Sequence, residues 1–277
     1  MMKSALLLLG ESPSSIAAGA YARRLAGTLG VRLIGLAGID LAFIEAPMPG
    51  AIGGAAYHAQ METGLRAQAE TLRERLDAAF HRDCAAAGIV PECLSFAGDP
   101  FEQVTTASAG CDLVIAGHDV TFRGLVSEAH SDTLAQLLAA TPRPILVCPE
   151  AIGPEGDVLL AYDGSLPSMR ALQLFVLCGG WADRRVRVLS VDTALDAAER
   201  LARDAAAYLR LHGYAVEPCP VQSSESPAGV IQAQAAGEGV ELLVMGAYGH
   251  RGLKEFLFGS TTQNIIGAPQ SCIFIYH

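Results

Sequence analysis

Lysine is almost absent from this sequence, and positive charge is in short supply overall. Lys3 and Lys254 are the only lysines among 277 residues, and Asp and Glu outnumber Lys and Arg by 29 to 19, for a net charge of −10. A P-loop needs a GxxxxGK[ST] pattern whose lysine contacts the phosphates, and the sequence contains none. Nucleic-acid-binding domains carry a basic face, so the acidic balance argues against a nucleic-acid partner.

Signatures of metal sites and membrane segments are also missing. The seven cysteines are scattered, with no CxxC and no Cys/His pair at metal-ligand spacing. This usage is typical of buried, reduced thiols in a cytosolic protein. The apolar run in MMKSALLLLG is too short for a signal peptide, and no stretch approaches the ~20 apolar residues of a membrane span. We therefore expect a cytoplasmic protein with no metal site and no membrane contact.

Short apolar runs alternate with helix-like segments along the whole chain. The first run is Ala5–Leu9, and the first half closes at Pro144–Cys148. After the linker Glu150–Gly156, the alternation starts again at Val158–Tyr162 and closes at Cys272–Tyr276. Continuous apolar runs are typical of strands that are buried on both faces of a parallel sheet. Strands that alternate with helices therefore predict an open parallel α/β sheet.

Similar short segments in the two halves of the chain indicate an internal repeat of about 140 residues. LLLLGESPSS at 6–15 parallels LLAYDGSLPS at 159–168, and CDLVIAGHDV at 111–120 parallels VELLVMGAYG at 240–249. We therefore predict an α/β fold made of two tandem Rossmann-like domains, residues 1–150 and residues 156–277, each with a five-stranded parallel sheet.

A glycine-punctuated loop in the second half has the features of a phosphate-binding site. The apolar run Leu242–Met245 leads into GAYGHRG at 246–252, and Gly259-Ser260-Thr261-Thr262 then opens a helical segment. Glycine lets the backbone approach an anion closely. The free N–H groups and the dipole of a helix N-terminus favour negative charge, and the hydroxyl groups add hydrogen-bond donors.

The pattern Gly246-x2-Gly249-x9-Gly259-Ser260 resembles the nucleotide-binding signature of the universal stress protein family, in its ATP-binding branch. The resemblance covers nearly the whole chain as a tandem pair. It implies an adenine nucleotide alpha hydrolase-like fold, ATP with Mg²⁺ as the ligand, and a regulatory role in the stress response. Domains of this family pair through their closing strands, which would otherwise be unpaired edges. The resemblance thus implies an intramolecular pairing of the two halves, and a homodimer of the whole chain is left open.

Candidate nucleotide-binding residues follow from the resemblance and from the rule that ligands bind at the carboxyl ends of strands in open α/β sheets. They are Asp163, Gly164, Val191, Met245, Gly246, Gly249, His250, Arg251, Gly259, Ser260, Thr261 and Thr262. By resemblance, Asp163 faces the nucleoside and the glycines with Ser260 cradle the phosphates. The alternatives are that Asp163 caps the following helix, that the glycines form turns and a helix boundary, that Met245 is a core residue, and that His250 and Arg251 are solvated.

The first half departs from this pattern. Gly10 stands opposite Asp163, so the acid is missing unless Glu11, one position later, takes its place. Val120 replaces the second glycine and His130 replaces the third, while the serine of the motif is kept. Asp132 follows, and its charge would repel phosphates. We therefore expect residues 1–150 to form a degenerate domain that does not bind ATP in the family's manner.

Three functions compete at this point. The leading hypothesis is a stress or regulatory protein that binds one ATP in its C-terminal domain. A slow ATPase is the second, although no poised general base and no P-loop lysine is evident. The third is an interaction scaffold without a nucleotide.

Overall fold

The computed structural model describes residues 1–45, 55–123, 130–237, 239–247 and 260–277. The strands of its sheet are β1 (Ser4–Leu8), β2 (Arg32–Asp40), β3 (Glu92–Gly98), β4 (Leu113–Gly117), β5 (Ile145–Cys148), β6 (Asp157–Ala161), β7 (Arg185–Asp192), β8 (Ala215–Gln222), β9 (Val240–Gly246) and β10 (Cys272–Tyr276). The helices are α1 (Pro13–Leu29), α2 (Leu41–Ile44), α3 (Ala55–Ala86), α4 (Pro100–Ser108), α5 (His130–Ala140), α6 (Leu166–Cys178), α7 (Leu195–Leu211), α8 (Pro227–Ala235) and α9 (Ser260–Gly267).

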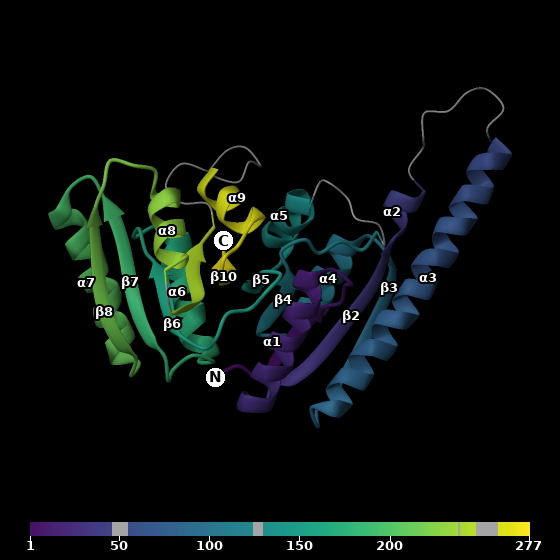
Figure 1. The fold of residues 1–277 in the computed structure, drawn as a ribbon, viewed down its shortest axis with the longest axis horizontal. Coiled ribbons are helices and arrows are strands. Elements are labelled where there is room, and N and C mark those ends of the chain that lie inside the picture. The colour runs from purple at the N-terminus through teal and green to yellow at the C-terminus, as the bar shows by residue number, and fades with distance from the viewer. Residues whose placement is uncertain (46–54, 124–129, 238, 248–259) are drawn as a thin grey trace.

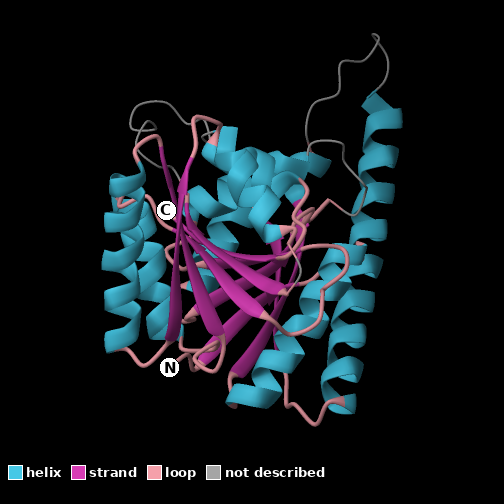
Figure 2. Ribbon diagram, turned by 60° about the vertical axis from the view of Figure 1, so that its left-hand side comes forward, coloured by secondary structure: helices cyan, strands magenta, loops and turns pink. Residues whose placement is uncertain are grey.

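A single ten-stranded sheet runs through the whole molecule (Figure 1). Its order is β3-β2-β1-β4-β5-β10-β9-β6-β7-β8. Neighbouring strands are parallel within each group of five, and β5 pairs antiparallel with β10 where the groups meet. Helices cover both faces of the sheet (Figure 2). The fold is therefore α/β, with two Rossmann-like parallel groups whose strands follow the same order. The domain boundaries at 150 and 156 stay a prediction.

The strands in the middle of the sheet are buried on both faces. Every residue of β1, β4 and β5 is buried, as continuous apolar sequences predict for a parallel sheet. Successive side chains of a strand point to opposite faces. Accordingly, Ala5 and Leu7 join one core cluster and Leu6 and Leu8 join another. Each cluster includes residues of both β5 and β10, so both layers of core continue across the junction.

The outermost strands have the properties of edges. Every residue of β8 is exposed or only partly buried, and so is every residue of β3 except the buried Phe96. Pro218 and Pro220 both lie in β8, where a missing N–H faces no further strand.

The second strand is long and leads directly into a short helix. β2 continues to Asp40, which pairs with Gly98 of β3. Gly38 interrupts the apolar run, because a side chain there would collide with the ring of Phe96. The short helix α2 follows, and its first turn is capped by Asp40, whose carboxylate accepts a hydrogen bond from the N–H of Phe43 at 3.0 Å.

A buried polar network joins the two halves beside the β5–β10 junction. Glu241 at the start of β9 is only 3% exposed, and its carboxylate pairs with Arg24 of α1. The Tyr21 hydroxyl and the backbone N–H of Gly156 also donate to this carboxylate, at 3.2 and 3.1 Å. The indole N–H of Trp181 donates to the Tyr21 oxygen at 2.9 Å. Burial raises the pKa of Tyr21 well above its usual value, so the hydroxyl keeps the proton that it donates to Glu241.

Replacing Glu241 by alanine is expected to lower the free energy of unfolding by about 2–4 kcal/mol, because buried donors and a cation lose their acceptor. Urea denaturation measures this loss. Glu217→Ala is the matched control, since Glu217 on β8 is 54% exposed and its pairing with Arg185 spans 3.6 Å. Exposed pairs contribute at most ~1 kcal/mol. Equal effects of the two substitutions would contradict the role of the network.

Candidate functional site

The predicted nucleotide site lies at the carboxyl edge of the second parallel group. There β6 and β9 are neighbours, with Leu160 opposite Val244. The Tyr162–Ser165 turn follows β6 and leads into α6, and α9 returns the chain from the edge to β10. Because a helix that connects parallel strands runs back along the sheet, the N-termini of α6 and α9 both lie at this edge. This is the place where open α/β sheets bind ligands.

Asp163 lies in the turn between β6 and α6. Its side chain is exposed, and Oδ1 accepts a hydrogen bond from the N–H of Ser165 at 3.0 Å. The N-cap of α6 is Ser165, whose hydroxyl accepts from the N–H of Ser168 at 3.3 Å. The helix therefore uses a serine as its cap, and the carboxylate of Asp163 organises the turn before it.

Gly164 has a backbone that requires glycine. Its φ of +73° lies in the left-handed region, and a Cβ there would come within 2.7 Å of Leu201 Cδ2. Residues with a side chain rarely adopt this φ. The glycine thus sets the direction in which the Asp163 turn enters α6.

Packing at the end of β9 leaves no space for a side chain at position 246, so a glycine is required there. A Cβ at this position would lie 2.5 Å from both the carbonyl carbon of Pro167 and the N of Ser168, in the first turn of α6. Gly117 at the end of β4 has the same surroundings, since a Cβ there would lie 2.6 Å from the N of Ser15 in α1. The close approach of helix and strand therefore explains why both halves have this glycine, although the first half lacks the other two glycines of the motif.

The other candidate residues that the structure describes are half-buried or buried. Val191 is half-buried near the end of β7. Met245 is 4% exposed within the core cluster that contains Leu243 and Ile273, which fits the core role that the sequence left open. Thr262 in α9 is 3% exposed. Their contacts with a nucleotide stay a prediction.

Other candidates are only partly covered by the structure or lie beyond it. Ser260 and Thr261 form the start of α9. Gly249, His250, Arg251 and Gly259 lie outside the described residues. The phosphate cradle therefore stays a prediction.

Two aromatic side chains at this edge were missed by the sequence reasoning. Tyr162 directly precedes Asp163, and burial, helped by the carboxylates of Asp204 and Asp163, raises its pKa, so its hydroxyl is a donor at neutral pH. His277 follows the last strand and stacks on Tyr276, with 5.1 Å between ring centroids. Burial lowers the pKa of His277, with a contribution from Arg170, which favours the neutral imidazole. The sequence could have identified these two side chains by their positions directly after β6 and β10.

In the first half, a carboxylate occupies the start of α1. The Ser12 hydroxyl donates to Asp119 Oδ1 at 2.6 Å, and the Ser14 hydroxyl also donates to this oxygen. Asp119 follows β4, and negative charge is favoured at a helix N-terminus. The sequence reasoning assigned the repulsion of phosphates to Asp132 and missed this internal anion.

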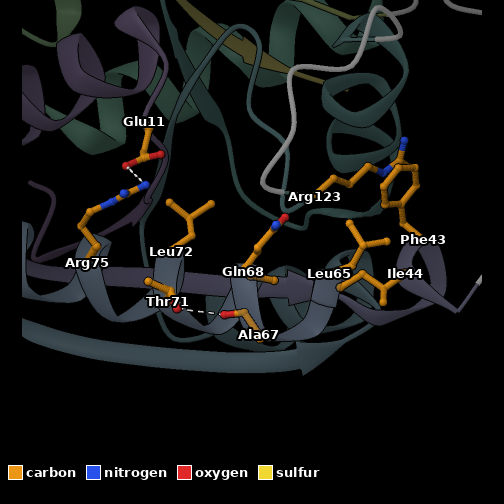
Figure 3. Close-up of a pocket in the computed structure, with 11 residues that line it drawn as sticks. Glu11, Phe43, Ile44, Leu65, Ala67, Gln68, Thr71, Leu72, Arg75 and Arg123 are labelled. Carbon is orange, nitrogen blue, oxygen red and sulfur yellow. Dashed lines mark hydrogen bonds and ion pairs between the residues drawn. The ribbon is translucent and has the colours of Figure 1, made fainter. Parts of the chain in front are cut away.

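The first half also contains a cavity of about 410 Å³ beside α3 (Figure 3). Arg75 lies at one end, 2.5 Å from the carboxylate of Glu11. Arg123 lies at the other, 3.1 Å from a carboxylate oxygen of Asp40, with its guanidinium over the Phe43 ring. Its lining consists of Glu11, Phe43, Ile44, Leu65, Ala67, Gln68, Ala69, Thr71, Leu72, Arg75 and Arg123. Both arginines are neutralised by carboxylates, which distinguishes this amphipathic cavity from a phosphate site.

Gly246→Ala is expected to destabilise the protein by about 1–3 kcal/mol, because the methyl group overlaps backbone atoms that cannot rotate away. Thermal or urea unfolding measures this. Gly229→Ala is the control: Gly229 lies exposed in α8 with no atom within 4 Å of the added Cβ. This control substitution should raise the free energy of unfolding by up to ~1 kcal/mol, since alanine favours the helix more than glycine does. Unchanged stability in Gly246→Ala would show that the first turn of α6 can move away from β9.

Comparison with known proteins agrees with this architecture. The universal stress protein family model matches residues 156–273. The universal stress protein Slr1230 of Synechocystis is 25% identical over 135 residues, which cover 48% of this chain and 46% of that protein. The matched part of the chain thus spans about half the length of this relative.

Two solved structures extend over nearly the whole chain. A universal stress protein from Archaeoglobus fulgidus aligns with 99% of this chain and 97% of its own, at 18% identity and a TM-score of 0.69. A candidate universal stress protein from Pseudomonas aeruginosa aligns over 99% and 93%, at 17% identity and a TM-score of 0.57. At these identities the likeness shows a common fold. In the described residues, no helix combines the length and apolar character needed to cross a bilayer. Residues 156–273 of the chain therefore match the universal stress protein family.

Proposed function

We propose that the C-terminal half binds one ATP, with Mg²⁺, at the carboxyl edge of β6 and β9, and that the protein acts as a nucleotide-binding regulator in the stress response. The observation that carries this proposal is the position of Asp163. Its exposed carboxylate is held in a turn directly beside the end of β9, within the segment that matches the family model.

The nucleoside end of the ligand would lie over the ends of β6 and β7. There Asp163 accepts hydrogen bonds from a ribose hydroxyl or from the adenine amine, and the backbone of Val191 meets the base. The half-buried Tyr162 supplies a further donor from the same turn. Charge-assisted hydrogen bonds of this kind are stronger than neutral ones, so Asp163 contributes most to the nucleoside contacts.

The phosphates would lie at the start of α9. Backbone N–H groups of a helix N-terminus favour anions, and Ser260, Thr261 and Thr262 begin this helix. The glycines of the preceding loop let the backbone approach closely. By their position in the sequence, Arg251 adds positive charge and His250 adds an imidazole hydrogen-bond donor.

One nucleotide per chain is expected, because the first half is built differently at the corresponding edge. Gly10 stands where the second half has Asp163. The start of α1 already holds the Asp119 carboxylate, which accepts hydrogen bonds from Ser12 and Ser14. A phosphate group would have to displace this internal anion or bear its repulsion.

Isothermal titration of the full chain with ATP and Mg²⁺ should give one site. Asp163→Ala should weaken binding about 10–100-fold, since hydrogen bonds to a charged group contribute ~1.5–3 kcal/mol. Asp183→Ala is the control: Asp183 is 74% exposed and precedes β7, at the opposite edge of the sheet, so affinity should not change. Gly259→Asp, which adds a negative charge to the predicted cradle, should abolish binding.

Other outcomes have equally definite meanings. Two sites per chain would show that the first half also binds nucleotide in spite of Asp119. No binding by the folded wild type would reject the nucleotide site and leave an interaction scaffold.

A further inference from the structure

A cluster of metal-binding side chains lies between α3 and the edge strand β3, in the half that lacks the nucleotide motif. Asp77 and His81 are one helical turn apart on α3, so they share a face of the helix. Cys93 comes from β3. One possible ligand atom from each of the three side chains lies within 4.8 Å of the other two. Figure 1 shows α3 running alongside β3 at the outer side of the sheet.

The Asp77 carboxylate has an unsatisfied oxygen. Its Oδ1 is shielded from solvent and accepts no hydrogen bond from the described part of the chain. His81 Nδ1 lies 3.3 Å away, but the same nitrogen is 2.9 Å from the Asp77 backbone carbonyl, to which its proton is donated. Buried acceptors without a partner are rare in folded proteins. A bound cation would satisfy this oxygen.

Cys93 supplies the sulfur atom of the cluster from the edge strand β3. Its thiol is half-buried. Because a divalent cation deprotonates a coordinating thiol, binding of a metal ion by Cys93 would release a proton.

The charged groups around this cluster do not repel a cation strongly. Arg73 is the positive group that acts on Cys93, and it is engaged by Glu70, with its Nε 3.1 Å from a carboxylate oxygen. Glu74 lies on the same stretch of helix and acts on Arg73 as a further negative charge. The buried Cys84 thiol is the other group near Cys93. Among the described residues, the arginine that acts on this cluster is thus already paired with a carboxylate.

We propose that Asp77, His81 and Cys93 form a zinc site that fastens α3 to the edge strand β3. Thiolate, imidazole and carboxylate are the usual ligands of Zn²⁺, and three protein ligands leave one position open for water. The sulfur and nitrogen donors favour zinc over Mg²⁺ or Ca²⁺. His81 and Cys93 are twelve positions apart in the sequence, and the turn from α3 into β3 brings them together.

Titration of the metal-free full-length protein with Zn²⁺ and, as a spectroscopic probe, Co²⁺ tests the proposal without any nucleotide. The wild type should bind one ion per chain and show the near-ultraviolet thiolate-to-cobalt charge-transfer band. About one proton should be released per zinc, which titration in two buffers of different ionisation enthalpy measures. Cys93→Ser should remove both the band and the proton release.

Matched variants separate coordination from an effect on folding. His81→Gln should weaken zinc binding by more than the ~10–100-fold that loss of an outer-shell partner costs, with an unchanged circular dichroism spectrum. Cys219→Ser is the control, because Cys219 is a half-buried thiol on the opposite edge strand β8. It should bind both ions as the wild type does. Absence of the cobalt–thiolate band in the wild type, or its persistence in Cys93→Ser, would overturn the proposal.

Discussion

The antiparallel pairing of β5 with β10 is the constraint on which the rest of the architecture depends. Each of these strands closes a parallel group, and each would otherwise present a row of unpaired backbone groups. Their pairing makes one sheet of ten strands and lets both core layers continue across the junction. Glu241, with its partners Arg24 and Tyr21, fixes the helix α1 of one half against the strand β9 of the other.

The two halves keep the same framework and differ at their carboxyl edges. Both start their first helix with a serine cap, Ser12 and Ser165, and both end the fourth strand of the group with a glycine against that helix. What differs is the chemistry placed on this framework. The second half presents the exposed carboxylate of Asp163, whereas the first half holds Asp119 at the start of α1. Packing therefore preserves the shared residues, and the site residues are free to diverge.

The long helix α3 belongs to the divergent part of the first half. It forms one wall of the amphipathic cavity and carries two of the three side chains of the proposed zinc site. A metal that joins α3 to β3 would rigidify the edge of the sheet beside this cavity. The two halves would then have separate ligands, a nucleotide in one and a cation in the other, on a common core.

Sequence periodicity determined the α/β class, and the glycine spacing with its family resemblance predicted a candidate site after the β9 segment. These features follow from local patterns, namely continuous apolar runs, helix caps and glycine spacing. Tertiary structure decided the features that depend on distant residues. The packing role of Gly246 against Pro167, the hydrogen bonds of Asp119 with Ser12 and Ser14, and the meeting of His81 with Cys93 all join residues of different helices, strands and turns. No local pattern encodes such contacts, because they arise only when the sheet places helix starts and strand ends side by side.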